Sequence, residues 1–211
     1  MSIPATNASK PREVIPAGNY PATCYQMIEI GTITETIMGK NQTHSKVRIG
    51  WELPTENRVF DEAKGPQPMV ISQEYTLSMN EKSNLRKMLA AWRGKDFTDE
   101  ESKNFDVSKL IGKPCMINII HKVKKDGSGV YAQISSVTPP PKGMQKFKQI
   151  NDTFLLSYDE FDEELFRKLP DFITNVMKTS VEYKELMEPN KIQVKGFEPI
   201  DDDVENGDLP F

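Results

Sequence analysis

The sequence is poor in the residue types that usually mark secreted, membrane-spanning or metal-dependent proteins. Its 211 residues include two cysteines, Cys24 and Cys115, and two histidines, His44 and His121. Both cysteines lie in apolar stretches, and no pair of these residues has metal-ligand spacing, so we expect neither a disulfide framework nor a metal site. No apolar run approaches the roughly 18 residues of a membrane span, and the N-terminus lacks the layout of a signal peptide. We therefore expect a cytoplasmic protein without cofactor or membrane contact.

Motifs of the common enzyme classes are also missing. The chain has no phosphate-binding glycine loop, no Gly-x-Ser-x-Gly and no His-Glu-x-x-His. A metal-dependent nuclease would need a carboxylate cluster, and Glu52, Asp61, Glu62 and Glu74 are available but unpatterned. We expect a binding protein rather than an enzyme.

Charge is distributed unevenly along the chain. The net charge is −4. Residues 1–150 hold 21 Lys and Arg against 15 Asp and Glu, whereas residues 151–211 hold 6 against 16. A basic body favours a polyanionic partner, and an acidic tail on the same chain can occupy the same site when that partner is absent.

The residue pattern divides the chain into four parts. Residues 1–16 are polar and rich in proline, and the residues after 188 are rich in Asp, Gly and Pro, so neither end is expected to join a core. The predicted parts are a flexible N-terminal arm over 1–16, a nucleic-acid-binding domain over 17–141, a basic linker and helical appendix over 142–187, and a disordered acidic tail over 188–211.

Periodicity predicts the elements of the main domain. Alternation of apolar and polar residues predicts five strands, and apolar residues at helical spacing predict a helix that contains Leu85, Met88, Leu89 and Trp92. The polar stretch 31–45 predicts a long loop between the first two strands. The five strands are expected over 20–30, 46–53, 69–77, 114–124 and 130–137.

This order matches an OB-fold, a small five-stranded barrel with its helix between strands three and four. The predicted fold class is therefore mainly β (α+β). An immunoglobulin-like sandwich needs more strands and lacks the helix. Two further helices are expected over 159–169 and 171–187, with a stripe of Phe172, Val176, Tyr183 and Leu186 in the second. They either pack on the barrel or form a homodimer contact.

Cations and exposed aromatic rings suit single-stranded nucleic acid, because cations neutralise phosphates and bases stack on flat rings. The alternative is that the lysines form a solvated surface and the tyrosines are wedges in the barrel. Trp51 and Trp92 fall on the apolar side of their periods and are assigned to the core. The candidate nucleic-acid-binding residues are Tyr25, Lys46, Arg48, Tyr75, Lys82, Arg86, Lys122, Lys124, Lys125 and Tyr131.

The C-terminal segment 201–211 contains five acids and no base, and ends in Leu-Pro-Phe. A tail that serves only solubility does not require a terminal apolar tripeptide. An apolar residue with a free carboxylate suits a basic pocket with an apolar slot, and the acids add long-range steering. The predicted partner-docking residues are Asp201, Asp202, Asp203, Asp208, Leu209, Pro210 and Phe211.

These features resemble the single-stranded DNA-binding proteins of bacteria and their phages, in which an OB-fold body carries an acidic tail that ends in an apolar residue, proline and phenylalanine. The stretches 47–53, 75–94 and 112–121 resemble the phage-encoded proteins more than the bacterial housekeeping protein. The sequence lacks the housekeeping protein's Gln/Gly-rich linker and has extra helices near 159–187, which argues against its tetramer.

The resemblance implies a protein that coats single-stranded DNA without strong sequence preference during phage or bacterial DNA replication, recombination or repair. Its tip would recruit a polymerase, helicase, primase or recombinase, and would lie across the basic groove when DNA is absent. The alternative is a protein-interaction adaptor that binds no nucleic acid.

Overall fold

The computed structural model describes residues 14–188, apart from residues 104 and 146. These residues form six strands and five α-helices, and no helix among them is long and apolar enough to cross a membrane. The strands are β1 (Gly18–Ile37), β2 (Lys40–Val59), β3 (Pro66–Thr76), β4 (Pro114–Val123), β5 (Val130–Thr138) and β6 (Phe154–Leu156). The helices are α1 (Asn84–Arg93), α2 (Asp99–Lys103), α3 (Glu163–Arg167), α4 (Asp171–Met177) and α5 (Val181–Met187), with a 3-10 turn η1 (Val107–Leu110).

The main strands form one antiparallel sheet in the order β3-β2-β1-β4-β5. The expected mainly β fold, with three strands, a helix and a hairpin in this chain order, is confirmed. No ladder joins β3 to β5 in the described part of the chain. Helix α1 contacts both of these strands, so it lies where the two ends of the curved sheet approach each other.

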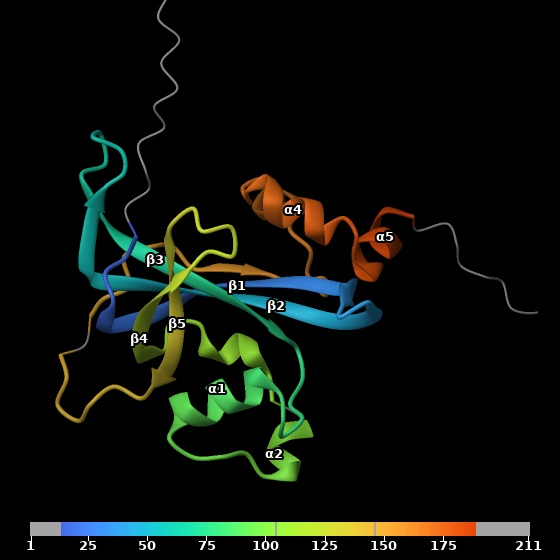
Figure 1. Ribbon diagram of the computed structural model, residues 1–211, viewed down its shortest axis with the longest axis horizontal. Helices are drawn as coiled ribbons and strands as arrows, with labels where there is room; N and C mark the ends of the chain where they lie inside the picture. The colour runs from blue at the N-terminus through green and yellow to red at the C-terminus, as the bar shows by residue number, and fades with distance from the viewer. Residues whose placement is uncertain (1–13, 104, 146, 189–211) are drawn as a thin grey trace, which may run out of the picture.

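The first core fills the space between the sheet and α1 (Figure 1). Trp51 of β2 and Trp92 of α1 are 0% and 6% exposed, and their ring centroids lie 6.0 Å apart. The Trp92 indole donates to the Pro114 carbonyl at 3.0 Å, which satisfies its polar atom. The assignment of both tryptophans to the core is confirmed.

Strand β1 is buried on both faces because bulges change which side its residues face. Register shifts occur between Cys24 and Gln26 and between Glu29 and Gly31. Met27 therefore joins Cys24 in the first core, while Ile28 packs on the opposite side of the sheet. An unbroken two-residue period over 20–30 would place Cys24 and Ile28 on one face, but each bulge inserts a residue that breaks this period.

The C-terminal segment covers that opposite side and builds a second core. Phe166, Ile173 and Met177 pack against Ile28 and Ile30 of β1. Figure 1 shows α4 and α5 across the sheet from α1. The helical appendix is thus packed on the sheet, the first of the two arrangements left open by the sequence.

The predicted helix over 171–187 is instead two helices. Ser180 breaks it: its side chain is buried and caps α5 by accepting from the Tyr183 amide at 3.1 Å. The predicted stripe is also wrong in part, because Phe172 is 60% exposed while its neighbour Ile173 is buried. Val176 and Leu186 are exposed as well.

Two carboxylates attach this segment to the sheet. The side chain of Glu52 on β2 is fully buried and accepts from the backbone amides of Ile150 and Asn151, each at 2.8 Å. Glu182 on α5 accepts from the Thr32 amide and hydroxyl, each at 2.6 Å. Gly31 has φ +91°, and a Cβ there would lie 2.7 Å from the Glu182 carboxylate, so a larger residue would displace α5.

Strands β1 and β2 extend beyond the core as a hairpin that we call the β1–β2 arm, residues 34–43. The expected loop over 31–45 is wrong, because the strands continue to a two-residue turn at Met38 and Gly39. Cross-strand hydrogen bonds join Thr34 to Thr43 at 2.9 Å and Thr36 to Asn41 at 2.8 Å. Apart from Ile37 and Met38 at its tip, the arm consists of Gly39 and of polar residues that are exposed or half-buried, so its sequence lacks the alternation that predicts a strand.

Candidate nucleic-acid interface

Two adjoining hollows run beside β3, with volumes of about 540 and 270 Å³. Both are lined by Gln73, Tyr75 and Asn84, so they form one continuous depression that we call the β3 groove. The groove lies between β2 on one side and α1 with β5 on the other. It opens along the free edges of the sheet, where no strand of the described residues pairs with β3 from this side.

Cations predominate along the β3 groove. Lys46 and Lys82 line its larger part and Lys87 its smaller part, whereas Glu74 is the acid among the lining residues. Glu74 is neutralised by Arg48 at 2.9 Å, and Lys46 is held by Glu35 at 2.5 Å. Lys82 and Lys87 are exposed. Among the described residues, neither lysine forms an ion pair with a carboxylate.

Helix α1 positions the second wall of the groove. Ser83 caps the helix by accepting from the Arg86 amide at 3.1 Å, and Gly94 ends it with φ +77°. Because the residues at helical spacing, such as Leu85 and Leu89, are buried in the first core, the opposite face presents Lys87. The uncompensated amides of the first turn add a partial positive charge near Asn84.

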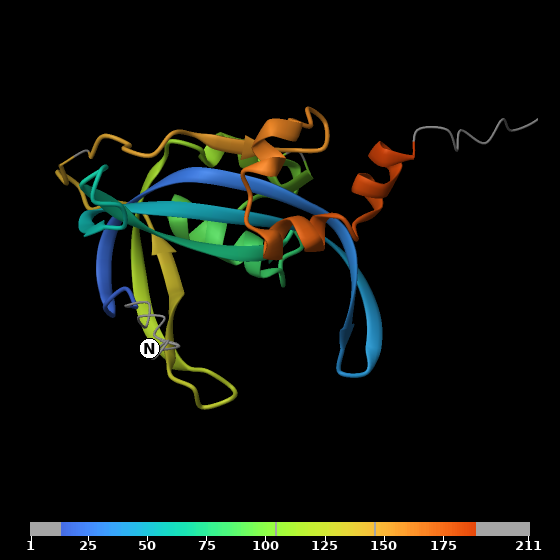
Figure 2. The ribbon, with the colours of Figure 1, turned by 90° about the horizontal axis from the view of Figure 1, so that it is seen from above.

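Two hairpins flank this side of the molecule. Figure 2 shows the β1–β2 arm and the hairpin of β4 and β5 projecting in the same direction. We call the second hairpin the β4–β5 arm, residues 121–132. Its lysines, Lys122, Lys124 and Lys125, are exposed. Tyr131 is 42% exposed and sits opposite Lys122 in the ladder, so ring and cation share one face of the arm.

The turn of the β4–β5 arm is set by its own residues. Lys124 donates from its amide to the Gly129 carbonyl at 2.9 Å, and Asp126 accepts from the Ser128 amide at 3.0 Å. Hydrogen bonds from Ser128 hold the pKa of Asp126 below its usual range. The carboxylate therefore stays ionised within the turn and partly offsets the neighbouring lysines.

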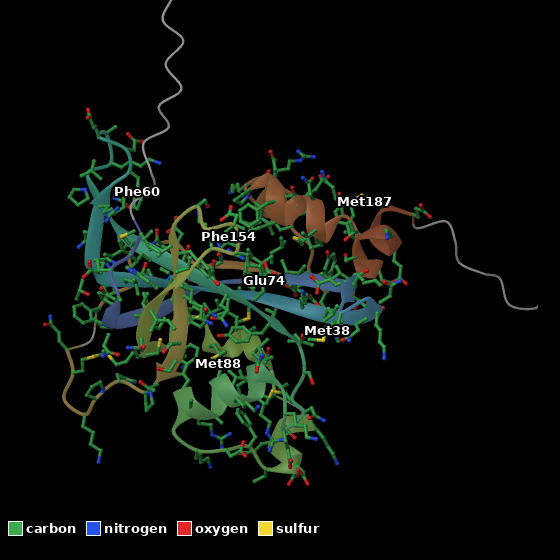
Figure 3. All side chains as sticks on the ribbon, viewed as in Figure 1. Met38, Phe60, Glu74, Met88, Phe154 and Met187 are labelled. Atoms are coloured by element: carbon green, nitrogen blue, oxygen red, sulfur yellow. The ribbon has the colours of Figure 1, made fainter. Side chains whose placement is uncertain are left out.

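The tip of the β1–β2 arm is apolar. Met38 is fully exposed at the end of the arm (Figure 3) and has φ 51°, a conformation that non-glycine residues seldom adopt. Its neighbour Ile37 is 39% exposed. Two-residue turns of this kind favour Asn-Gly, so Met38 occupies a position where a polar residue would stabilise the turn better.

Two predicted residues are buried, although Tyr75 borders the β3 groove. Tyr75 is 5% exposed, and burial raises the pKa of its phenol above the ordinary range. Arg86 is 6% exposed and donates to the Phe97 and Met79 carbonyls at 2.7 and 3.2 Å and to Asp96 at 3.3 Å. The prediction that Arg86 lies on the exposed face of α1 is wrong, because this guanidinium ties the helix to the loop that follows it.

Two others lie on the side of the sheet that the C-terminal segment covers. Arg48 donates to Ser72 at 2.6 Å and lies 5.4 Å from the ring centroid of Phe172 on α4. Burial raises the pKa of the half-buried Tyr25, Glu52 raises it further and Arg48 lowers it, which places the phenol near both charges. The outer face of β1 and β2 is therefore not the open surface that the sequence predicted.

The structure thus brings Lys46, Lys82 and the largely buried Tyr75 together at the β3 groove. It leaves Lys122, Lys124, Lys125 and Tyr131 on a flanking arm. Sequence reasoning missed Gln73, Asn84, Ser135 and Ser136, which line the groove. Polar residues of this kind carry no pattern that separates a groove from ordinary surface. The sequence does indicate that Lys87 is exposed, because its position in the helix is opposite the apolar residues that face the core.

The predicted docking residues, Asp201, Asp202, Asp203, Asp208, Leu209, Pro210 and Phe211, lie outside the described residues. Within the described part, no group of three or more His, Cys, Asp or Glu could hold a metal ion. Cys24 and Cys115 are free and buried, and burial raises the pKa of the Cys24 thiol to about 12.

Comparison with protein-family models finds no match to this chain, and comparison with curated proteins finds no significant relative.

Proposed function

We propose that this protein binds single-stranded DNA without strong sequence preference and coats it during phage or bacterial DNA replication, recombination or repair. The observation that carries the proposal is the β3 groove, in which Lys46, Lys82 and Lys87 line a depression flanked by two projecting arms. A lysine-lined groove tracks phosphates through charge alone and does not read base edges.

The order of the strands in the sheet supports this proposal. The sheet order β3-β2-β1-β4-β5, with α1 between β3 and β4 in the chain, is compatible with an OB-fold, which we propose for residues 17–141. Closure would bring β3 and β5 together, and here both strands contact α1. In OB-folds, the connections between strands one and two and between strands four and five flank the oligonucleotide, and the two arms occupy these places.

The arms supply the contacts that bases require. Tyr131 offers an exposed ring beside Lys122, and a base stacked on such a ring gains about 1–3 kcal/mol. Met38 adds an apolar side chain at the tip of the other arm. A strand lying along β3 could contact both arms, which favours unpaired over duplex nucleic acid because duplex bases are stacked inside the helix.

We further propose that the acidic tip docks replication or recombination proteins such as a polymerase, helicase, primase or recombinase. Its five acids and terminal Leu209, Pro210 and Phe211 support this role. The same acids are complementary in sign to the lysines of the β3 groove. The tip therefore competes with DNA at low salt.

Charge reversal in the groove tests the DNA-binding site. In the variant Lys82→Glu with Lys87→Glu, affinity for oligo-dT should fall. The plot of the logarithm of the association constant against the logarithm of salt concentration should become less steep, by at least about 0.7 per lysine lost. Fluorescence anisotropy at several salt concentrations measures both. The matched control is Lys168→Glu with Lys178→Glu, which changes two exposed lysines on the side of the sheet that carries α4.

The control should retain wild-type affinity and slope. Equal losses in both variants would mean that only net charge matters and would overturn the groove as the site. Absence of binding by the wild-type protein at low salt would favour the adaptor alternative.

A further inference from the structure

A second groove adjoins the larger part of the β3 groove at Ser78, which lines both, and carries the opposite charge. Its volume is about 680 Å³, and Met27, Val47 and Leu85 form part of an apolar floor. These three residues belong to the first core, so the groove is an opening into that core. The floor is continued by partly exposed residues such as Leu155 of β6.

Carboxylates predominate at the rim of this acidic groove. Glu29, Asp106, Asp159 and Glu160 line it, together with one lysine, Lys103. Hydrogen bonds from Ser108 hold the pKa of Asp106 below its usual range, so that carboxylate is ionised near neutral pH. Four acids around an apolar floor repel a nucleic-acid backbone and attract an apolar segment that carries cations.

The chain itself presents a segment of that chemistry on the β4–β5 arm. Val123 is 71% exposed and Val130 is 42% exposed, and the two are paired across the ladder. Lys124 and Lys125 follow Val123 directly and are exposed. Cross-strand partners share a face, so this valine pair lies on the face of the arm opposite Lys122 and Tyr131.

We propose that the acidic groove of one copy receives the valine face of the β4–β5 arm of a second copy, with Lys124 and Lys125 meeting the carboxylates at the rim. Burying the two valines removes apolar surface from water, and the opposite charges orient the arm. The other face of the arm, with Lys122 and Tyr131, stays available for DNA.

The contact joins two different surfaces, so it is head-to-tail. Figure 2 shows the β4–β5 arm projecting from the side opposite β6, whose residues line the acidic groove, so the arm does not reach the groove of its own chain. A head-to-tail contact that does not close into a ring extends into a chain of copies. Such a chain would lay successive β3 grooves along one DNA strand.

Sedimentation of the full-length protein without nucleic acid tests this inference independently of DNA binding. At low salt, the weight-average mass of the wild-type protein should rise with concentration, and added salt should reverse the rise. The arm variant Lys124→Glu with Lys125→Glu and the groove variant Asp159→Lys with Glu160→Lys should each remain monomeric. Circular dichroism checks that both variants are folded.

An equimolar mixture of the two variants is the decisive sample. The intact arm of the groove variant can enter the intact groove of the arm variant, and the two reversed surfaces are also opposite in charge, so mixing should restore an association that rises with concentration and is reversed by salt. A monomeric mixture, a wild-type protein that stays monomeric at every concentration, or self-association of either variant as in the wild type would overturn the inference. If the arm variant is unfolded, Val123→Ser replaces it, because that exposed side chain contributes nothing to either core.

Discussion

At the scale of single residues, Met38 is unfavourable for the stability of the arm, but we propose that it favours DNA binding. A fully exposed, apolar residue with φ 51° gains nothing from its own chain, whereas asparagine adopts that conformation more easily. Met38→Asn should therefore raise the free energy of unfolding by roughly 0.5–1 kcal/mol, part of the cost of the left-handed conformation. The same change should weaken binding to oligo-dT, because it removes the apolar contact at the tip of the arm.

Urea denaturation and anisotropy measure the two effects on the same sample. Met187→Asn is the matched control, since Met187 is exposed on α5 and lies apart from Met38 (Figure 3). The control should leave DNA affinity unchanged. Undiminished affinity in Met38→Asn would exclude a role for this residue in binding.

At the scale of elements, the attachment of α5 to β1 depends on one carboxylate. Burial raises the pKa of Glu182, but hydrogen bonds from the Thr32 hydroxyl and amide outweigh it, and the pKa lies below its usual range. A lowered folded-state pKa means that this stabilisation is present above the unfolded-state pKa, about 4.3. It is lost as the pH falls through the folded value.

Glu182→Gln should therefore lower the free energy of unfolding at pH 7, by less than about 1 kcal/mol because the carboxylate is largely solvated. The difference from the wild type should shrink as the pH falls below 4. Urea denaturation at pH 7 and in the acid range measures both. Glu185→Gln, which changes an exposed position on the same helix, should leave the free energy of unfolding at the wild-type value at both pH values. If Glu182→Gln remained less stable than the wild type by the same amount at low pH, the result would contradict this account.

The strands show which buried faces could be predicted from hydrophobic alternation and why the prediction failed for the others. Val47, Ile49, Trp51 and Leu53 alternate without interruption, and all four are buried as predicted. β1 breaks its period at two bulges, and nothing in a single sequence marks where a bulge falls. Prediction from hydrophobic pattern requires a regular ladder with one buried face, and the β1–β2 arm lacks the buried face.

The candidate site was predictable only in part, for a related reason. Lys82 could be placed beside a groove because its exposure follows from its position before the helix. Arg48 and Arg86 also looked like surface cations, yet both guanidiniums hold other parts of the chain. Local sequence shows that a cation is present, but only tertiary packing decides whether its hydrogen bonds are already used.

At the scale of the whole molecule, the two sides of the sheet differ in what covers them. The C-terminal helices cover one side and bury the outer face of β1, while α1 and the two arms leave the β3 groove open on the other. The cationic and the acidic groove adjoin at Ser78 but have different linings and opposite charge, which suits the proposal that the protein binds a polyanion and also contacts its own copies. The acidic tip adds a competing charge that is covalently attached to the body.

The most direct test of DNA binding is a salt titration of affinity for oligo-dT and for duplex DNA, using the full-length protein and a variant that ends at residue 200. The account predicts tighter binding to oligo-dT than to duplex, a steep fall in affinity with salt, and tighter binding at low salt once the tip is removed. Equal affinity for both DNAs, or no binding to oligo-dT at low salt, would contradict it.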